Sequence, residues 1–498
     1  MTHALRWIGA GLALGLASPG CGPAPVAHVA AAGVPAPARP APAVPVAPLI
    51  RALLDTLAFG RARAAYPGLQ AGAEVRAFYG PATAPAWMLP ADSAEVGSNA
   101  TAALALLGRA AEYGLHPADY GHARLLALHD SLAQPASLAL PARRAGQQAR
   151  LEVYLSDAVL TFRRDLDRGR LRAYTPSVRE KLALAAPPAA LRAALASHTV
   201  PAALLAGQPA NREYRQLQQA LARWLALPFD PDSARLHQAR YEQAALNLER
   251  WRWEAVAQGP DYALINIPAY ELHVVAHDSV LRRYRVVVGK PLTPTPTLSS
   301  AITYFTLAPD WHVPRSIAVR EMLPRLRKDP DYLARHNYAL YDQQGQLLDP
   351  GRISWARVTA RQFAFTIRQS TCCDNALGNI VFRFANPYSV YLHDTPQRQL
   401  FAQPYRALSH GCIRLEHPLA LAAYLLRRAG QPASLPSDDA CARQPRPRTV
   451  RLRQPLALYV RYATCTAENG HLRFFADSYQ RDEAVRRALF GPLALARR

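Results

Sequence analysis

The chain has 498 residues, half of them hydrophobic, and a formal net charge of +22 at pH 7. Its length exceeds what one hydrophobic core usually organises, so two or three domains are expected. The positive charge comes mainly from arginines spread along the chain, and it fits either a carboxylate-bearing polyanion or a solvated surface. No nucleic-acid-binding motif accompanies the charge, so a nucleic-acid partner is not expected.

The N-terminus predicts an export signal. Arg6 precedes an apolar stretch, Trp7 to Ala17, which is too short to span a bilayer but suits the core of a signal peptide. A lone cysteine, Cys21, follows a glycine and resembles a lipoprotein cleavage site. We therefore predict a lipoprotein-type signal peptide over residues 1–21 and a lipid on Cys21. Ordinary cleavage further on, in the alanine-rich stretch near Val29, is the alternative.

Two segments of different composition follow the signal. Residues 22–48 are almost entirely Ala, Pro, Val and Gly, which predicts an extended tether. Residues 49–244 carry apolar residues at three-to-four spacing, broken by Pro and Gly, which predicts short helices. The clearest helical patterns lie at 102–112, 150–170 and 213–225. We expect aromatic residues such as Tyr79, Trp87 and Tyr154 to pack in the core of this region.

The pattern changes to strands from Asp261 onward. Segments rich in branched and aromatic residues, bounded by Pro, Gly and Asp, predict strands at 263–267, 272–276, 280–288, 299–307, 380–384 and 389–392. A helical stretch at 315–335 is interrupted by Pro324 and Pro330. A further helix is predicted at 419–429, ended by Gly430.

One histidine and one cysteine form a candidate catalytic pair. His393 lies 19 residues before Cys412, which is directly preceded by His410 and Gly411. Cysteine attacks as thiolate, so a catalytic cysteine needs a base that takes its proton, and a histidine suits this task near neutral pH. Gly411 has no Cβ and lets the backbone turn sharply, so that amide N–H groups can face a developing oxyanion.

A metal site is a weaker interpretation of the same residues. His393, His410, Cys412 and His417 could be drawn as ligands, but neither the C-x-x-C nor the H-x-x-x-H spacing is present. We therefore expect no metal and no cofactor.

The local sequence resembles the active-site motif of the L,D-transpeptidases, the cysteine enzymes that cross-link peptidoglycan. It resembles in particular the large multi-domain branch found in Gram-negative envelopes. The likeness extends to five further segments: Leu264 to Pro268, Val286 to Pro291, Trp311 to Ile317, Leu326 to Tyr332 and Asn386 to Tyr391.

The resemblance implies an α+β fold in two parts. A helical scaffold domain would occupy residues 49–244. A mostly β catalytic domain would occupy residues 245–480, with a cap insertion at about 312–375, and residues 481–498 would form a C-terminal tail. It also implies a periplasmic location, with the membrane reached only through the N-terminal anchor.

The implied reaction is acyl transfer. Cys412 would attack the carbonyl of the third residue of a peptidoglycan stem, expel the terminal D-alanine and hold the donor as a thioester. His393 would act as general base, and an acceptor stem would then form a diaminopimelate-to-diaminopimelate cross-link. Carbapenem-type inhibitors are expected to acylate the same cysteine.

Other motif residues receive supporting roles from the resemblance and from their positions. Tyr391 is similar to the family tyrosine near the oxyanion site, and Arg414 would bind a stem carboxylate through its planar guanidinium. Ser409 would position the turn. His410 would orient the loop or serve a purely structural role, and Trp311 would line the cleft under the cap or pack in a core.

Two alternative functions stay open. With the same fold, water or a protein amine could resolve the thioester, which would make the protein an L,D-carboxypeptidase, an endopeptidase or a protein-attachment enzyme. A protein of another class, a wall-binding lipoprotein without catalysis, would not require Cys412 and His393 together.

Four cysteines have no proposed role: Cys372, Cys373, Cys441 and Cys465. Their number permits three pairings in an oxidising compartment. Neighbouring Cys372 and Cys373 pair with each other only under strain, which favours a bond between Cys441 and Cys465.

Overall fold

The computed structural model describes residues 44–58, 68–81, 83–88, 97–134, 140–171, 187–228, 230–254, 259–371, 374–432, 434–437 and 446–491. The predicted signal peptide, Cys21 and nearly all of the tether lie outside these ranges. Cys372, Cys373 and Cys441 lie outside them as well. Within the described ranges, no helix combines the length and the apolar character that crossing a membrane requires.

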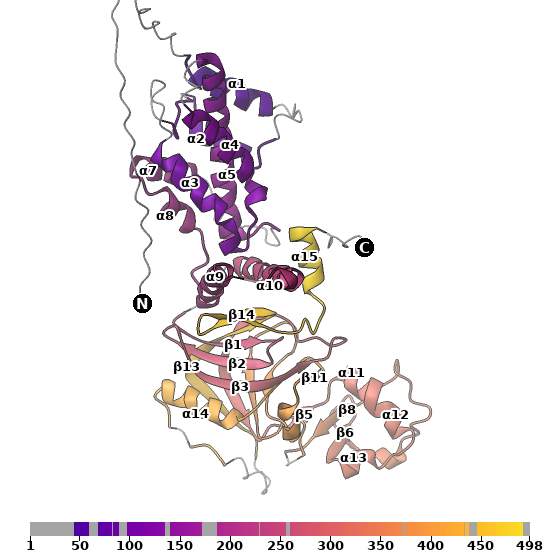
Figure 1. Ribbon diagram of the computed structural model, residues 1–498. Helices are drawn as coiled ribbons and strands as arrows, with labels where there is room; N and C mark the ends of the chain where they lie inside the picture. Colours follow the sequence, from indigo (N-terminus) through magenta and orange to yellow (C-terminus); the bar gives the residue numbers. More distant parts are fainter. Residues whose placement is uncertain are drawn as a thin grey trace, which may run out of the picture. The chain divides into compact units, whose positions relative to one another are not determined.

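Helices occupy the N-terminal half of the described chain: α1 (Ala47–Ala58), α2 (Gly72–Tyr79), α3 (Ser98–Gly108), η1 (Ala110–Tyr113), η2 (Pro117–Tyr120), α4 (His122–Ala133), α5 (Pro141–Arg168), α7 (Pro187–Ala196), α8 (Val200–Leu205), α9 (Arg212–Leu225), η4 (Pro231–Ser233) and α10 (Ala234–Arg252). Helix α5 contacts α1, α2, α3, α4, α7 and α8, and Figure 1 shows these helices around it. Its 28 residues begin at Pro141, a position where proline suits a first helical turn. The predicted helix at 150–170 is confirmed as the second part of α5.

A buried carboxylate joins α5 to the segment before α3. Glu152 is fully buried, and its two oxygens accept the backbone N–H groups of Ala86, Trp87 and Met88 at 2.8 to 3.0 Å. The Tyr79 hydroxyl donates to the same carboxylate at 2.8 Å. Tyr79, Trp87 and Tyr154 are all buried, which confirms the prediction that they are core residues.

The second half forms a nine-stranded mixed sheet in the order β11-β3-β12-β10-β9-β4-β13-β1-β2, in which β2 also pairs with β3. The sheet therefore closes on itself through β3. Its strands are: β1 (Asp261–Asn266), β2 (Glu271–Ala276), β3 (Ser279–Gly289), β4 (Leu298–Leu307), β9 (Ile380–Phe384), β10 (Leu392–His393), β11 (Ala407–Ser409), β12 (Ile413–Leu415) and β13 (Arg448–Arg461). Helices η7 (Arg398–Ala402) and α14 (Pro418–Arg428) lie between strands, and apolar residues of α14 join the core of the sheet.

The four strands predicted between 263 and 307 are confirmed as β1 to β4, and the strand at 380–384 as β9. The strand predicted at 389–392 is wrong in its bounds, because Ser389 has a positive φ of 56° and β10 begins at Leu392. Strand β13 was not predicted. Its apolar and polar residues do not alternate regularly, because exposed arginines and a register shift between Arg451 and Leu456 interrupt the pattern.

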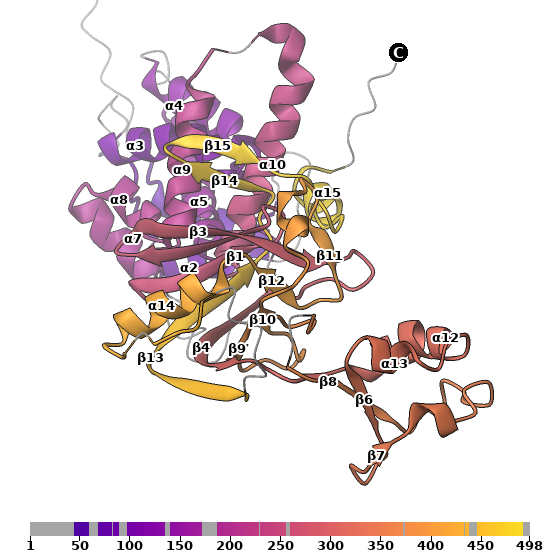
Figure 2. The same ribbon diagram turned by 90° about the horizontal axis from the view of Figure 1, so that it is seen from below.

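A separate small sheet lies within the insertion between β4 and β9 (Figure 2). Its order is β5-β8-β6-β7, and its own apolar core includes Leu326, Leu340 and Trp355. Its elements are: β5 (Trp311–His312), α11 (Arg315–Ile317), η5 (Ala318–Met322), α12 (Leu323–Leu326), α13 (Tyr332–Arg335), β6 (Tyr338–Tyr341), β7 (Leu347–Leu348), η6 (Pro350–Arg352) and β8 (Thr366–Gln369). We call this insertion the cap. Its strands have two to four residues each, too few to give a periodic signal.

The C-terminal segment continues past the large sheet. Strands β14 (Cys465–Glu468) and β15 (His471–Phe474) form a hairpin, and helix α15 (Asp482–Phe490) follows and contacts α10. Helix α15 lies within the predicted C-terminal tail, and its Leu489 is buried. Cys465 is a free, fully buried thiol in a hydrophobic cluster, so the favoured disulfide with Cys441 is not formed.

Candidate active site

Strands β9, β10 and β12 are neighbours in the sheet (Figure 2). Leu392 of β10 pairs with Phe382 of β9 and Ile413 of β12, and all three are fully buried in the core. Successive side chains of a strand point to opposite faces, so their neighbours point away from that core. This second face carries a set of five polar residues: Arg383, Tyr391, His393, Cys412 and Arg414.

Cys412 is half-buried next to Tyr391. Burial is the largest influence and raises the pKa of Cys412, while the main chain and hydroxyl of Tyr391 and the charges of Arg383 and Arg414 oppose the rise. The thiol is therefore protonated near neutral pH and requires a base before it can attack.

His393 is buried on the same face of the sheet, and its strand β10 pairs with β12, which begins directly after Cys412. Its Nδ1 lies 2.5 Å from the carbonyl oxygen of Asp394. A carbonyl can only accept, so Nδ1 carries the proton and Nε2 is the basic nitrogen. Burial, with the charges of Arg414 and Arg383, lowers the pKa of His393 to about 3. This corrects the expectation of titration near neutrality: the imidazole is the neutral, proton-accepting form at physiological pH.

His410 points to the cap. Its Nε2 lies 2.5 Å from Oε1 of Glu321, which belongs to η5. This contact joins the loop before Cys412 to the cap. The placement fits an orienting role for His410 better than a role as base.

The loop that carries Cys412 is a tight turn closed by Ser409. The Ser409 hydroxyl donates to the Cys412 carbonyl at 2.5 Å and accepts the Gly411 N–H at 3.1 Å. Gly411 has a φ of +119°, a conformation that favours glycine. The Gly411 N–H is thus engaged by Ser409 and is not available to an oxyanion. Within the described ranges, the N–H of Cys412 itself has no acceptor.

Arg414 and Trp311 complete the surroundings. Arg414 donates to Oε1 of Gln397 at 2.6 Å, and the Trp311 side chain, on strand β5 of the cap, lies close enough to the Tyr391 hydroxyl to influence its pKa. Trp311 thereby brings the cap onto the catalytic face, and it also packs at the edge of the cap's core. The burial of Tyr391 raises its pKa well above the usual range, so its hydroxyl remains a donor.

Sequence reasoning missed Arg383. Its guanidinium lies 4.7 Å from the centre of the Tyr391 ring. Its positive charge lowers the pKa of both Cys412 and His393. It is the one charged residue of strand β9, a signal that the sequence contained. Within the described part of the chain, neither Arg383 nor Arg414 pairs with a carboxylate, so both can receive one from a ligand.

A polar cavity of about 450 Å³ lies elsewhere, between α9 and the strands β1 and β2. Three of the arginines that line it already pair with carboxylates: Arg212 with Glu213, Arg461 with Glu254 and Arg473 with Glu271. No cysteine lies in its lining, so the candidate active site is the face that carries Cys412.

Two stretches of the chain match known protein families. Residues 260–435 match the L,D-transpeptidase catalytic domain, and residues 73–221 match the scaffold domain. A putative L,D-transpeptidase of Haemophilus influenzae is 32% identical over 281 residues, which are 56% of this chain and 54% of that protein. The chain thus spans about half the length of this curated relative.

Among solved structures, an L,D-transpeptidase from Mycobacterium smegmatis shows 18% identity and a TM-score of 0.21, over 41% of this chain and 58% of that one. That likeness is too low to support a conclusion. The family matches confirm the resemblance seen in the motif, and they confirm the α+β class with a helical scaffold and a mostly β catalytic domain.

We expect His393→Ala to slow acylation of Cys412 by about a hundred- to ten-thousandfold, the usual loss for a general base. Because the pKa of His393 is lowered to about 3, the base form persists at every pH above that value. The rate should therefore rise with the ionisation of the thiol, and no limb near pH 6.5 should belong to His393. Acylation rates of wild type, His393→Ala and His410→Ala between pH 5 and 9 check this. A wild-type limb near pH 6.5 that disappears in His393→Ala would contradict it.

Replacing Arg383 with methionine removes a cation that favours the Cys412 thiolate. We expect the pKa of the thiol to rise, so that alkylation of Cys412 by iodoacetamide at pH 7 slows about three- to tenfold. Arg453→Met, on the exposed part of β13, is the matched control and should keep the wild-type rate. Equal rates for both variants would remove Arg383 from the site.

Proposed function

We propose that this chain, through its L,D-transpeptidase catalytic domain, cross-links peptidoglycan stem peptides by way of a thioester on Cys412. The observation that carries the proposal is the single sheet face on which a protonated thiol, a neutral imidazole and two carboxylate-free arginines meet. Each of these groups has a place in acyl transfer from a peptide that bears carboxylates.

The first half-reaction forms the thioester. As the Cys412 sulfur attacks the donor carbonyl, its proton passes to Nε2 of His393, the nitrogen left free by the bond from Nδ1 to Asp394. The carbonyl oxygen becomes an oxyanion, and the free N–H of Cys412 and the Tyr391 hydroxyl are the donors that we assign to it. Collapse breaks the peptide bond, and the amine of D-alanine leaves with the proton from His393.

The second half-reaction transfers the acyl group. An acceptor amine attacks the thioester and gives its proton to the neutral His393, and the Cys412 thiolate leaves and is reprotonated. A diaminopimelate amine as acceptor gives the cross-link. Water as acceptor gives the carboxypeptidase alternative, and a protein amine gives the attachment enzyme.

The two arginines account for substrate choice. The donor stem bears carboxylates next to its scissile bond, and a guanidinium can bind a carboxylate through two parallel hydrogen bonds. Carboxylate binding would also reduce the positive charge that lowers the pKa of His393. Substrate would thus make the base stronger at the moment when it is needed.

The proposal also places the enzyme in the periplasm, held to a membrane by a lipid on Cys21. The apolar run from Trp7 to Ala17, the lone cysteine and the proline-rich tether support this location. The tether would then separate the folded body from the membrane surface.

Cys412→Ala should abolish acyl-enzyme formation, because it deletes the nucleophile and little volume. Intact-mass spectra after incubation with a tetrapeptide donor or a carbapenem measure the adduct. Cys465→Ala, which removes the other free thiol of the described residues, is the matched control and should keep the adduct. Muropeptide analysis then separates the outcomes: cross-linked dimers support transpeptidation, and tripeptides alone show a hydrolase. An adduct that persists in Cys412→Ala would refute the assignment.

Cys21→Ser tests the anchor separately. If Cys21 is acylated, the wild-type protein should sediment with membranes and the serine variant should move to the soluble periplasmic fraction. Equal partition of the two proteins would instead support ordinary signal cleavage.

A further inference from the structure

The turn that carries Cys412 rests on the loop between β3 and β4. The Thr295 hydroxyl is fully buried, and it donates to the Gly411 carbonyl at 2.8 Å and accepts the Gly289 N–H at 2.9 Å. The Ser409 carbonyl accepts the N–H of Lys290 at 2.9 Å. The position of Gly411 therefore depends on the position of Thr295.

One phenol fixes both ends of this supporting loop. The Tyr479 hydroxyl donates to the Gly289 carbonyl at 2.7 Å and accepts the Thr295 N–H at 3.1 Å. Burial raises the pKa of Tyr479, so the hydroxyl keeps the proton that it donates. Tyr479 comes from the segment after β15, far along the chain from the loop it holds.

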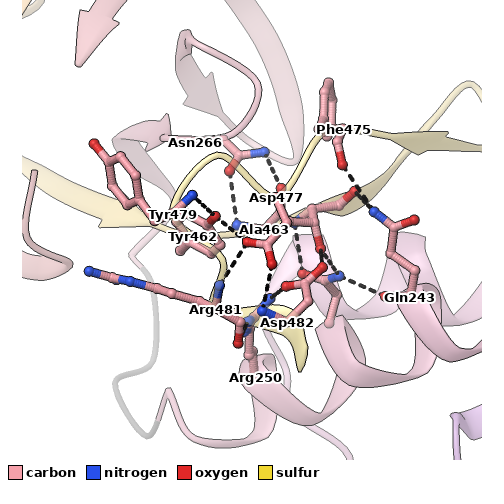
Figure 3. A network of polar contacts seen from close by, with 12 residues as sticks. Gln243, Arg250, Asn266, Tyr462, Ala463, Phe475, Asp477, Tyr479, Arg481 and Asp482 are labelled. Carbon is pink, nitrogen blue, oxygen red and sulfur yellow. Dashed lines mark hydrogen bonds and ion pairs between the residues drawn. The ribbon is translucent and has the colours of Figure 1, made fainter. Parts of the chain in front are cut away.

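Tyr479 is itself held by a turn built around Asp477 (Figure 3). The Asp477 carboxylate accepts the Tyr462 hydroxyl, the Arg481 N–H at 2.9 Å and the Asp482 N–H at 2.8 Å. The Tyr479 N–H donates to the Tyr462 hydroxyl at 2.8 Å, and the two rings stack with centroids 5.5 Å apart.

Helix α10 anchors that turn (Figure 3). Arg250 donates to the Asp482 carboxylate at 2.7 Å and to the Arg481 carbonyl at 2.9 Å. Gln243 donates to the carbonyls of Thr464 and Phe475, both at 3.0 Å. A continuous series of hydrogen bonds thus leads from α10 through the C-terminal turn and Tyr479 to the loop beneath Cys412.

We propose that Tyr479 is a positioning residue for the reaction. The C-terminal turn, bound to α10, fixes Tyr479, and the Tyr479 hydroxyl fixes the loop that carries Thr295. Thr295 in turn binds Gly411 and so holds Cys412 in the geometry for attack. The inference rests on the proposed function for its activity assay. A small displacement of a reacting group costs large factors in rate while ground-state binding survives.

Tyr479→Phe removes the hydroxyl and keeps the ring that stacks on Tyr462. We expect kcat for thioester formation to fall about ten- to a hundredfold, with KM and the melting temperature close to wild type. Tyr284→Phe is the matched control, because the buried Tyr284 hydroxyl has no hydrogen-bond partner in the described part of the chain. A Tyr479→Phe rate equal to wild type, or a loss matched by Tyr284→Phe, would overturn the proposal.

A double-mutant cycle tests the route. Thr295→Val removes the hydroxyl that reaches Gly411 at nearly constant volume. If Tyr479 acts through Thr295, the double variant should be no slower than the slower single variant. Additive losses would show that Tyr479 acts by another route and would overturn the proposal.

A second readout keeps this test apart from the test of function. If the wild type forms no thioester with the tetrapeptide donor, the proposed function fails. Alkylation of Cys412 by iodoacetamide, followed by peptide mapping, then decides the positioning role. The rate should change several-fold in Tyr479→Phe and stay constant in Tyr284→Phe; equal rates in both would overturn the inference.

Discussion

The candidate site depends on the alternation of side chains along β10 and β12. Leu392 and Ile413 are paired in register and buried, and the energy of burying them in the core opposes any slip of one strand past the other. A slip by one residue would turn Cys412 and His393 into the core. Strands β10 and β12 have only two and three residues, but burial of Leu392 and Ile413 is enough to fix the direction in which His393 and Cys412 point.

Burial and charge oppose one another at Cys412 and act together at His393. Burial alone would keep Cys412 protonated and His393 neutral, and the two nearby arginines favour the thiolate and further disfavour the imidazolium. The resting pair is neutral, unlike the thiolate–imidazolium pair of some cysteine enzymes. Under the proposed function, charge separation at this pair would therefore await the substrate.

Much of the site could be predicted from the sequence because a short motif carries its chemistry. Cys412 and His393 lie in one motif, at a spacing that indicates a catalytic pair, and β1 to β4 have regular apolar patterns. Arg383 was readable as the lone charge of a buried strand. Tyr479 was not, because its role depends on contacts with Gly289 and Thr295, about 190 residues earlier. The low pKa of His393 likewise follows from packing, which no local pattern records.

Helix α10 runs unbroken from Ala234 to Arg252, across the boundary predicted at residues 244/245. Its apolar side shares one cluster with α9 and with the outer face of the sheet, including Tyr214, Leu248 and Tyr262. On heating, α9 and α10 should therefore melt together with the β strands, as one cooperative unit. Helix α9 also contacts η1 of the helical region, so heating should not divide the molecule at the place where a comparison of sequences divides it.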